Sequence, residues 1–500
     1  MRPRRPRACD PGVDRTSHSA AGVRLTRLEI AALTVGVAVR VLAAIGFRPS
    51  WGFDFPYHLE YIEWVAKHWS RPDLNLNAAA YHSPLYYFLV APLVHFHAGA
   101  RVVQQVSIAC GCVRLGLLSL GLRRFLPGAP YARAVALLLA GVLPAAVQLD
   151  SHVSNEALGT TLAAVAVLAL PAVCGERPRL ADVLWFSLWW GLAVMTKVSY
   201  LLLGFVVLPF AARGAWLGLR EERGWPLSWS WGSARRALAP WALGGALFAA
   251  ITAPLFLVNL ARYGQPIVTG YDGPLLKWQQ AREAVPYFDR RTAGFYVAWD
   301  VDIWEVPYYP TSCCSSARFF PVLVASTFGD YLNYGFGIPV LPQEELFATK
   351  YNHRLVSPTT MNLSRLSVAA GSLLALVVAA ATLVVGRRLW RARDPRLALL
   401  ALPIAGVLGQ IHFATKFSAD TDGPVKGTYV QFAMLPAFAL VGLVFERCAR
   451  DRRFTRRALA VIVAAAVTAV AVYTITMKAG AVAFPPPPEP NPVSKTSSRS

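Results

Sequence analysis

The residues best suited to acid–base chemistry gather in one stretch, 51–87, with the sequence WGFDFPYHLEYIEWVAKHWSRPDLNLNAAAYHSPLYY. It carries Asp54, His58 and His82 among tyrosines and tryptophans, and strongly apolar segments flank it. Charged groups face lipid only at a large cost in free energy, so this stretch is predicted to be a loop at a membrane surface. A carboxylate, imidazoles and aromatic rings in such a loop indicate an enzyme acting at the membrane.

The composition of the whole chain is that of a polytopic membrane protein. Of its 500 residues, 55% are hydrophobic and 15% are charged, with a mean hydropathy of +0.41, whereas soluble proteins carry about 25% charged residues. The net charge of +21 comes from arginines clustered in short loops between apolar segments, as the positive-inside rule expects. No basic stripe interleaved with aromatic residues is present, which argues against nucleic acid as a partner.

Apolar segments near 20 residues recur along the chain, and each is long enough to cross a bilayer. Their lengths and the placement of the arginines predict an all-α protein of about 11 transmembrane helices. The predicted spans are 28–47, 106–122, 132–149, 157–174, the short pair 184–195 and 200–210, 241–258, 366–385, 397–413, 429–445 and 458–477. The apolar segment Pro84–His97 is too short to span and is expected to be a re-entrant or interfacial helix.

The same pattern divides the chain into parts. In order, these are a disordered cytoplasmic tail (1–27), an N-terminal transmembrane catalytic module (28–259) that includes the outer loop 48–83, an extracytoplasmic loop region (260–365), C-terminal transmembrane helices (366–477) and a disordered Pro-rich tail (478–500). The loop region is too long to be a plain connector, so an ordered cap is expected there.

The apolar segment lengths and the arginine placement put the acid-rich loops 54–63, 150–156 and 420–426 on one face of the bundle. With the basic N-terminal tail in the cytoplasm, that face is extracytoplasmic, and the chain is predicted to be a multi-pass protein of the plasma (inner) membrane. Loops that converge on one side are what a shared site requires. Because no nucleotide is available outside the plasma membrane, an energised donor must arrive in the lipid. A polyprenyl-phosphate sugar meets that need, with a protein, lipid or glycan hydroxyl as acceptor.

Glycosyl transfer requires a carboxylate that takes a proton from the acceptor hydroxyl, cations that hold the leaving phosphate, and aromatic rings beside the sugar. Asp54 is the candidate base. The candidate ligands of the donor phosphate are Lys426, Lys197, His58 and His82. The candidate substrate-lining residues are Tyr57, Tyr86, Tyr87, Asp150, Asn155 and Glu156.

Several of these side chains also have a purely structural interpretation. Asp54 precedes a helix expected to begin near Pro56 and would cap it. Asp150 and Glu156 would stabilise the N-terminus of the span that follows them. Lys426 instead precedes an apolar helix, where a cation opposes the helix dipole, and this mismatch favours a functional role.

A divalent metal ion is left open as a cofactor. Asp54, His58, Asp150 and His152 offer two carboxylates and two imidazoles, which suit such an ion. Their spacing matches no known ligand pattern, and the seven cysteines show no metal-binding spacing either. The chain also carries no GxGxxG motif and no P-loop.

Asp54, His58 and the segment YHSPLYY at 81–87 resemble, in that order, the first outer loop of the GT-C superfamily of membrane glycosyltransferases. The similarity is to the branch of protein O-mannosyltransferases and lipid A aminoarabinose transferases, and it extends over residues 28–446. Further matching pieces, in order, are Ser154-Asn155-Glu156, Thr196-Lys197, Tyr263-Gly264-Gln265-Pro266 and Lys426-Gly427-Thr428-Tyr429.

This resemblance implies a GT-C-like fold and transfer of a sugar from a lipid-phosphate carrier on the outer face, usually with inversion. It implies that Asp54 is the catalytic base. The chain departs from the family pattern at two positions: Phe55 stands where a glutamate often follows the aspartate, and Ser83 replaces a proline. Phe55 therefore leaves no second carboxylate at this point.

The alternative is a transporter or flippase of polyprenyl-linked glycans. Such proteins usually carry ionisable residues near the bilayer midplane and paired repeats with broken helices. Here the charged groups are expected to crowd one surface, and no repeat is visible in the sequence. Both features favour the enzyme. The sequence leaves the donor sugar, the acceptor and the oligomeric state open.

Overall fold

The computed structural model describes residues 24–47, 49–51, 54–77, 79–223, 231–269, 286–299, 318–329, 358–416 and 425–448. The described secondary structure is helical, and these residues contain no strand. The larger helices are α1 (Arg27–Gly46), α2 (Phe55–His68), α3 (Leu85–His95), α4 (Ala100–Phe125), α5 (Pro130–Val142), α6 (Pro144–Ser151), α7 (Glu156–Val173), α8 (Leu180–Thr196), α9 (Leu202–Arg223), α10 (Trp231–Tyr263), α13 (Phe319–Phe328), α15 (Pro358–Arg391), α16 (Leu397–Lys416) and α17 (Met434–Cys448). Shorter pieces are η1 (Pro49–Trp51), η2 (Val198–Leu201), η4 (Tyr287–Asp289), α11 (Ala293–Val297) and η6 (Gly427–Ala433).

The polytopic all-α architecture expected from the sequence is confirmed. In the described part of the chain, 8 helices are long and apolar enough to cross a membrane, or up to 9 if the bent pair α5–α6 is one span. The predicted number of eleven is not reached there. One reason is that α8, with 17 residues, is shorter than the other spans. The predicted span 458–477 and the tails 1–23 and 478–500 lie outside the described residues.

Several predicted spans differ from the structure in their bounds or continuity. The span expected at 132–149 is broken into α5 and α6, which meet at a bend of 51°. Pro144 begins α6 and has no N–H to continue the hydrogen bonds of α5, which is the physical reason for the break. The short pair expected at 184–195 and 200–210 corresponds to α8 and α9. The second helix is longer than expected, because it continues beyond the apolar segment to Arg223. The helix expected to begin at Leu366 already begins at Pro358.

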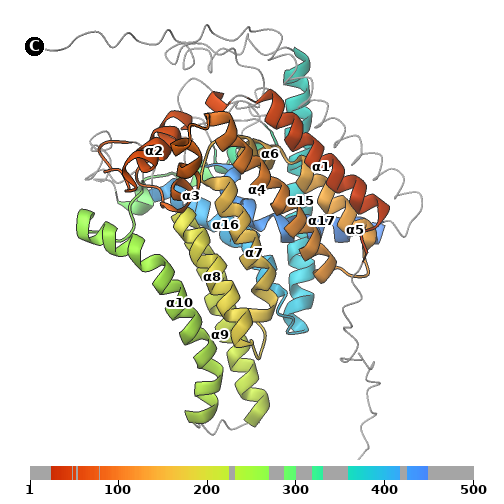
Figure 1. The fold of residues 1–500 in the computed structure, drawn as a ribbon. Helices are drawn as coiled ribbons and strands as arrows, with labels where there is room; N and C mark the ends of the chain where they lie inside the picture. Colours follow the sequence, from red (N-terminus) through yellow and green to blue (C-terminus); the bar gives the residue numbers. More distant parts are fainter. Residues whose placement is uncertain are drawn as a thin grey trace, which may run out of the picture.

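The first outer loop contains two helices packed on each other at one end of the bundle (Figure 1). α2 begins directly after Asp54, with Pro56 in its first turn, as the sequence predicts. α3 is a short apolar helix of 11 residues, which agrees with the expectation for Pro84–His97. The rings of Tyr61 and Tyr87 stack with their centroids 3.7 Å apart and fix α2 on α3.

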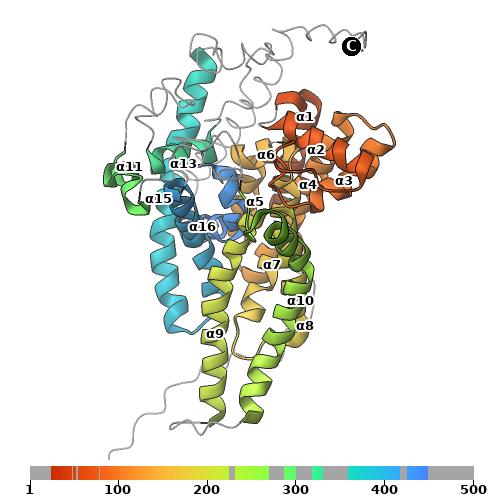
Figure 2. The ribbon, with the colours of Figure 1, turned by 90° about the vertical axis from the view of Figure 1, so that its left-hand side faces the viewer.

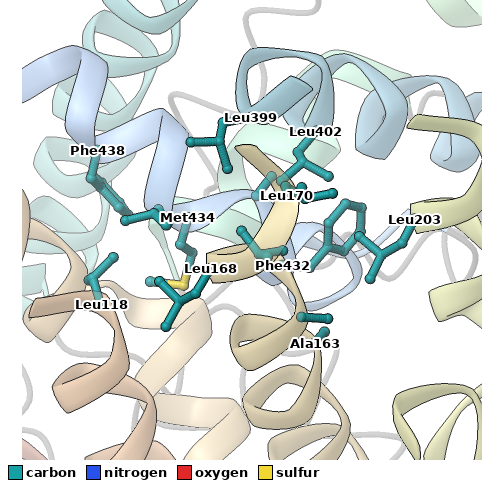
Figure 3. Close-up of a cluster of buried hydrophobic side chains, with 14 of the residues drawn as sticks. Leu118, Ala163, Leu168, Leu170, Leu203, Leu399, Leu402, Phe432, Met434 and Phe438 are labelled. Carbon is teal, nitrogen blue, oxygen red and sulfur yellow. The ribbon is translucent and has the colours of Figure 1, made fainter. Parts of the chain in front are cut away.

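The main core lies where the spans converge. Figure 3 shows apolar side chains from α4, α7, α9, α16, η6 and α17 meeting in one buried cluster. Its labelled members include Leu118, Leu168, Leu203, Leu402, Phe432 and Met434. This packing fixes the ends of α7, α9, α16 and η6 relative to one another, and those ends carry most of the site described below.

The helix directions sort charge between the two ends of the bundle. α4 ends at Arg123 and Arg124, α15 ends at Arg388 and Arg391, and α8 begins directly after Arg179. These termini lie at the end of the bundle opposite α2 and α3. Figure 2 shows α8, α9 and α10 reaching that opposite end. The arginine-rich end and the end that carries the first outer loop are therefore opposite, as the sequence predicts.

The region 260–365 is described only in part. Two helical pieces within it, 286–299 and 318–329, pack against α15 and α16 through Phe295, Phe319 and Val368. Arg290 also donates to the carbonyl of Lys416, 2.8 Å away. Residues 260–269 continue from α10, residues 358–365 belong to α15, and the rest of the predicted cap lies outside the described residues.

Candidate active site

A cavity of about 320 Å³ lies where the first outer loop, the α6–α7 turn, η2, α16 and η6 meet. The candidate base Asp54 and the four candidate phosphate ligands, Lys426, Lys197, His58 and His82, all line it. Two of the candidate substrate-lining residues, Asn155 and Glu156, line it as well. Five segments that are far apart in the sequence thus bring their polar residues to one place.

Asp54 stands at the residue before α2 in a left-handed conformation, with φ at 59°. Aspartate tolerates this conformation better than most residues, although it costs about 1–2 kcal/mol. Its side chain makes no cap hydrogen bond with α2. The capping interpretation of Asp54 therefore does not hold, and its carboxylate is at the cavity instead.

The two lysines share one aromatic ring. Lys197 forms an ion pair with Glu156, and its Nζ lies 4.1 Å from the centroid of the Tyr429 ring. The Nζ of Lys426 lies 5.8 Å from the same centroid. Both contacts fall within the range of cation–π attraction, so Tyr429 holds two ammonium groups near one another. Glu156 compensates one of the two charges, so Lys197, Lys426 and Glu156 together carry one net positive charge that can attract an anion.

The backbone at Lys426 is held on three sides. Its N–H donates to Oε1 of Gln410 over 3.2 Å, and the N–H of Gly427 donates to Oγ of Ser326 over 2.9 Å. The carbonyl of Gly427 accepts from Nε2 of Gln431 over 2.9 Å. A Cβ at Gly427 would lie 2.4 Å from Oγ1 of Thr327. Only glycine fits so close to α13, so these contacts set the direction from which Lys426 enters the cavity.

The imidazoles in the cavity wall are neutral near pH 7. Burial is the main cause that lowers the pKa of His58 to about 3 and the pKa of His152 to about 4. Burial also holds the pKa of His82 well below its ordinary value, and the charge of Lys197 acts in the same direction. Nδ1 of His58 lies 2.8 Å from the hydroxyl of Tyr87, and the His58 and His82 rings are 5.3 Å apart.

Three polar groups of the cavity wall have no hydrogen-bond partner within the described part of the chain. They are Oγ of Ser83, Oγ of Ser154 and Oδ1 of Asn155, and all three are buried. The amide of Asn155 is oriented by its Nδ2, which donates to the carbonyl of Thr196 over 2.8 Å. Buried polar groups are normally paired, so these atoms indicate hydrogen-bonding positions for a polar ligand.

Four predicted substrate-lining residues lie elsewhere. Tyr57 is 38% exposed on the outer side of α2, whereas Tyr86 and Tyr87 are fully buried between α2 and α3. Tyr87 does not line the cavity itself, but its hydroxyl is within hydrogen-bond distance of Nδ1 of His58, which does. Asp150 is not in an outer loop but inside the bundle at the end of α6, bound to Arg40 and Arg114. The sequence reading missed these partners because they lie in separate spans.

Of the four side chains considered as metal ligands, Asp54, His58 and His152 line the cavity, whereas Asp150 does not. Among the residues that the structure describes, no group of three His, Cys, Asp or Glu side chains is placed to hold a metal ion. Asp150 in particular is occupied by two arginines. The donor set present in the described cavity wall therefore does not fit a divalent metal.

The structure also adds residues that the sequence reading missed. Gln410, His412 and Phe413 line the cavity from α16, and Val268 and Thr269 line it from the segment after α10. Of these residues, Gln410 could have been predicted from the sequence. It is a polar side chain inside the apolar span 397–413, and such residues usually face the bundle interior.

Comparisons with known proteins add a likeness of fold. No protein-family model matches the chain, and no curated protein matches it. The chain is similar to the apo structure of ArnT from Cupriavidus metallidurans, with a TM-score of 0.45 and 15% identity over 90% of this chain and 75% of that one. The structure of the same protein bound to undecaprenyl phosphate matches with a TM-score of 0.37 and 15% identity, over 84% of this chain and 78% of that one.

A third match is the archaeal oligosaccharyltransferase AglB from Archaeoglobus fulgidus, in complex with an inhibitory peptide and a dolichol-phosphate. Its TM-score is 0.43 and its identity 12%, over 91% of this chain and 56% of that one. Because the TM-scores lie below 0.5, the function proposed next rests on the residues of the cavity.

Proposed function

We propose that the protein is a glycosyltransferase that moves a sugar from a polyprenyl-phosphate carrier to an acceptor hydroxyl. The observation that carries this proposal is the composition of the cavity wall. It combines a carboxylate at Asp54, two lysine ammonium groups and three buried polar atoms that lack partners among the described residues. A sugar phosphate presents hydroxyls and an anion to these groups, and each finds a partner of the required chemistry.

The position of the cavity supports a donor that arrives in the membrane. Part of its wall is apolar and comes from Leu202 and Phe205 on α9. Phe205 is 76% exposed, and Leu408 on the neighbouring α16 is 59% exposed. Exposed apolar side chains of a spanning helix face lipid, so the apolar wall is continuous with the lipid-facing surface. A polyprenyl chain in the membrane would reach the cavity from this side.

In the proposed reaction, Asp54 takes the proton of the acceptor hydroxyl while that oxygen forms the new bond to the anomeric carbon of the sugar. The bond between this carbon and the phosphate oxygen breaks, and the electron pair leaves with the polyprenyl phosphate. Lys426, with Lys197 held beside it by Tyr429, stabilises the charge that develops on the phosphate. The neutral imidazoles of His58 and His82 offer hydrogen bonds without adding charge. Attack opposite the leaving phosphate would invert the anomeric centre.

The proposed orientation places the cavity outside the plasma membrane and the arginine-rich end in the cytoplasm. Asn75 is exposed in the first outer loop and offers a test. In a single-cysteine background, an Asn75→Cys variant should react with a membrane-impermeant thiol reagent in intact cells. Reaction only after the cells are opened would reverse the orientation.

One observation favours the alternative of a transporter or flippase. Arg40, Arg114 and Asp150 are ionisable residues buried within the spans, and such residues often line transport pathways. They lie away from the cavity wall and are bound to one another. The buried polar atoms of Ser83, Ser154 and Asn155, which lack partners among the described residues, favour glycosyl transfer at the cavity over transport of a glycan across the membrane.

The test uses membranes that contain the wild type or Asp54→Asn, supplied with a panel of radiolabelled polyprenyl-phosphate sugars. Label is followed into lipid, protein and glycan fractions. Loss of a general base should lower transfer by at least about 100-fold while the protein stays folded. Asp73→Asn is the matched control, because Asp73 is an exposed acid of the same loop. Transfer by Asp54→Asn at the wild-type rate would refute the assignment, and movement of labelled carrier across liposomes without transfer would establish the alternative.

A further inference from the structure

Arg40, Arg114 and Asp150 form an ionic cluster inside the transmembrane bundle, apart from the candidate active site. They come from α1, α4 and α6, and the side chains of Arg40 and Asp150 are fully buried. The Arg114 side chain is 6% exposed. The cluster therefore sits in a medium where unbalanced charge is expensive.

The carboxylate of Asp150 is saturated by its two partners. Its Oδ2 accepts from Nε of Arg40 and from Nη2 of Arg114, each over 2.8 Å. Its Oδ1 accepts from the same Nη2 over 2.9 Å. Two guanidinium groups share one carboxylate, so the cluster carries one net positive charge.

No other described group compensates this charge. Glu29 is the other buried carboxylate on α1, and Arg133 binds it with Nε 2.7 Å from Oε1. Arg40 also donates from Nη1 to the carbonyls of Gly36 and Gly141, over 3.0 Å and 2.8 Å. These carbonyls satisfy hydrogen bonds but supply no full negative charge.

Both arginines have donors to spare, and both residues line one small cavity. Nη2 of Arg40 and Nη1 of Arg114 are buried and have no hydrogen-bond partner within the described part of the chain. A cavity of about 30 Å³ is lined by Arg40, Arg114 and Gln431, with leucine and phenylalanine side chains around them. One water-sized position needs about 10–15 Å³, so there is room for a small ion and one water.

We propose that this cavity binds a monovalent anion the size of chloride, which accepts hydrogen bonds from Arg40 and Arg114. The anion neutralises the excess charge of the cluster and satisfies its spare donors. Gln431 occupies the other wall, and its Oε1 also lacks a partner among the described residues. Its amide is oriented by the bond from Nε2 to the carbonyl of Gly427. A water beside the anion donates to this Oε1, so every polar group of the cavity is paired.

The site is tested on the purified full-length protein in detergent. Thermal unfolding is measured in sodium gluconate with increasing sodium chloride or bromide at constant ionic strength. A ligand that binds the folded state alone stabilises it, so chloride and bromide should raise Tm by roughly 2–4 °C and then saturate. Crystals grown in bromide should show an anomalous peak between Arg40 and Arg114.

Two variants locate the effect. Arg114→Gln leaves a neutral pair of Arg40 and Asp150, and it should lose the halide dependence of Tm. Gln431→Glu places a carboxylate at the cavity, so it should remove the halide response without removing either arginine, whatever the loss of its hydrogen bond to Gly427 does to the absolute Tm. Arg179→Gln is the control, because Arg179 belongs to an exposed ion pair with Asp182. It should respond to halide as the wild type does.

Equal Tm values for the wild type in gluconate and chloride would overturn the proposal. So would an unchanged halide response in Gln431→Glu, because the ion would then bind elsewhere. A structure in bromide with density at the cavity but no anomalous signal would assign the position to water and refute the anion. None of these outcomes bears on glycosyl transfer, which is measured separately.

Discussion

Single residues in the cavity owe their protonation states to burial. His58, His82 and His152 lie among Glu156, Lys197 and Lys426, yet removal from water is the largest cause of their lowered pKa values. Neutral imidazoles and charged lysines then coexist in one wall. This division leaves the positive charge for an incoming phosphate to the ammonium groups.

The histidines make stability depend on pH. The pKa of His58 is about 3 in the folded state and about 6.5 in an unfolded chain, so below pH 6.5 the unfolded chain binds the additional proton. The stability that neutral His58 contributes is present above pH 6.5 and is lost as the pH falls toward 3. The free energy of unfolding should fall by ~1.4 kcal/mol per pH unit for this histidine.

Denaturant unfolding of the wild type and His58→Asn between pH 6.5 and 4.5 measures this dependence. The variant should show the smaller slope, whatever its absolute stability. His68→Asn, exposed on the same helix, should keep the wild-type slope. Equal slopes for all three proteins would contradict the burial of a neutral His58.

Lys426 is the second residue whose charge should matter. Lys426→Met keeps the length of the side chain and removes the ammonium group. A hydrogen bond to a charged group contributes about 1.5–3 kcal/mol, so kcat/KM for the donor should fall roughly 10- to 100-fold. Steady-state transfer at varied donor concentration measures it. Lys67→Met, on the exposed side of α2, should have wild-type kinetics, and similar losses in both variants would remove Lys426 from the site.

Among the elements, η6 links the core to the cavity. It is a 3₁₀ helix of 7 residues, longer than the three or four that are usual. Phe432, near its end, lies in the main core, while Lys426 precedes its first residue. The packing of η6 against α13 and α16 therefore decides where the lysine ammonium group stands.

A methyl group at the start of η6 should displace Lys426. In Gly427→Ala, the new Cβ would meet Thr327 Cα at 2.5 Å and the carbonyl oxygen of Ser326 at 2.7 Å. The overpacking should cost about 1–3 kcal/mol of stability. The added shift of the turn should lower kcat/KM for the donor. Unfolding and transfer assays on one preparation separate the two effects.

Gly116→Ala is the matched control, because a Cβ there meets nothing within 4 Å. This variant should keep both stability and activity. If Gly427→Ala were as active as the wild type, the three-sided support of the Lys426 backbone would have no functional consequence.

At the scale of the whole molecule, buried ion pairs join helices that are distant in the sequence. Asp150 connects α6 to α1 and α4, and Glu29 connects α1 to Arg133 of α5. Such pairs are specific rather than simply stabilising, because a partner left alone in the interior is costly. They select one arrangement of the N-terminal helices, on which the first outer loop is mounted.

Asp150→Asn tests this arrangement. The substitution leaves two buried arginines without a carboxylate and should lower stability by roughly 3–5 kcal/mol. Unfolding in detergent, or the yield of monodisperse protein, measures the loss. Asp182→Asn breaks the exposed pair with Arg179 and should have no measurable effect. Equal behaviour of the two variants would show that the buried cluster does not hold the helices together.

The sequence by itself determined the all-α membrane class of the protein and most of its spans, and it predicted the end of the bundle where the candidate site lies. These features depend on apolar length and arginine placement, which are local properties of the chain. The same local pattern identified five candidate site residues, because polar side chains next to apolar spans are conspicuous in the sequence. They are Asp54, His58, His82, Lys197 and Lys426. The structure then brings these five side chains to one cavity.

Tertiary structure alone decided which polar residues meet. Asp150 looked like an outer-loop acid, but the bend at Pro144 turns α6 into the bundle, where Arg40 and Arg114 bind it. Gln410 looked like one residue of an apolar span, but the packing of α16 on η6 makes it support Lys426. In both cases the partners lie in different helices, so their contact follows from helix packing, which no local pattern in the sequence encodes.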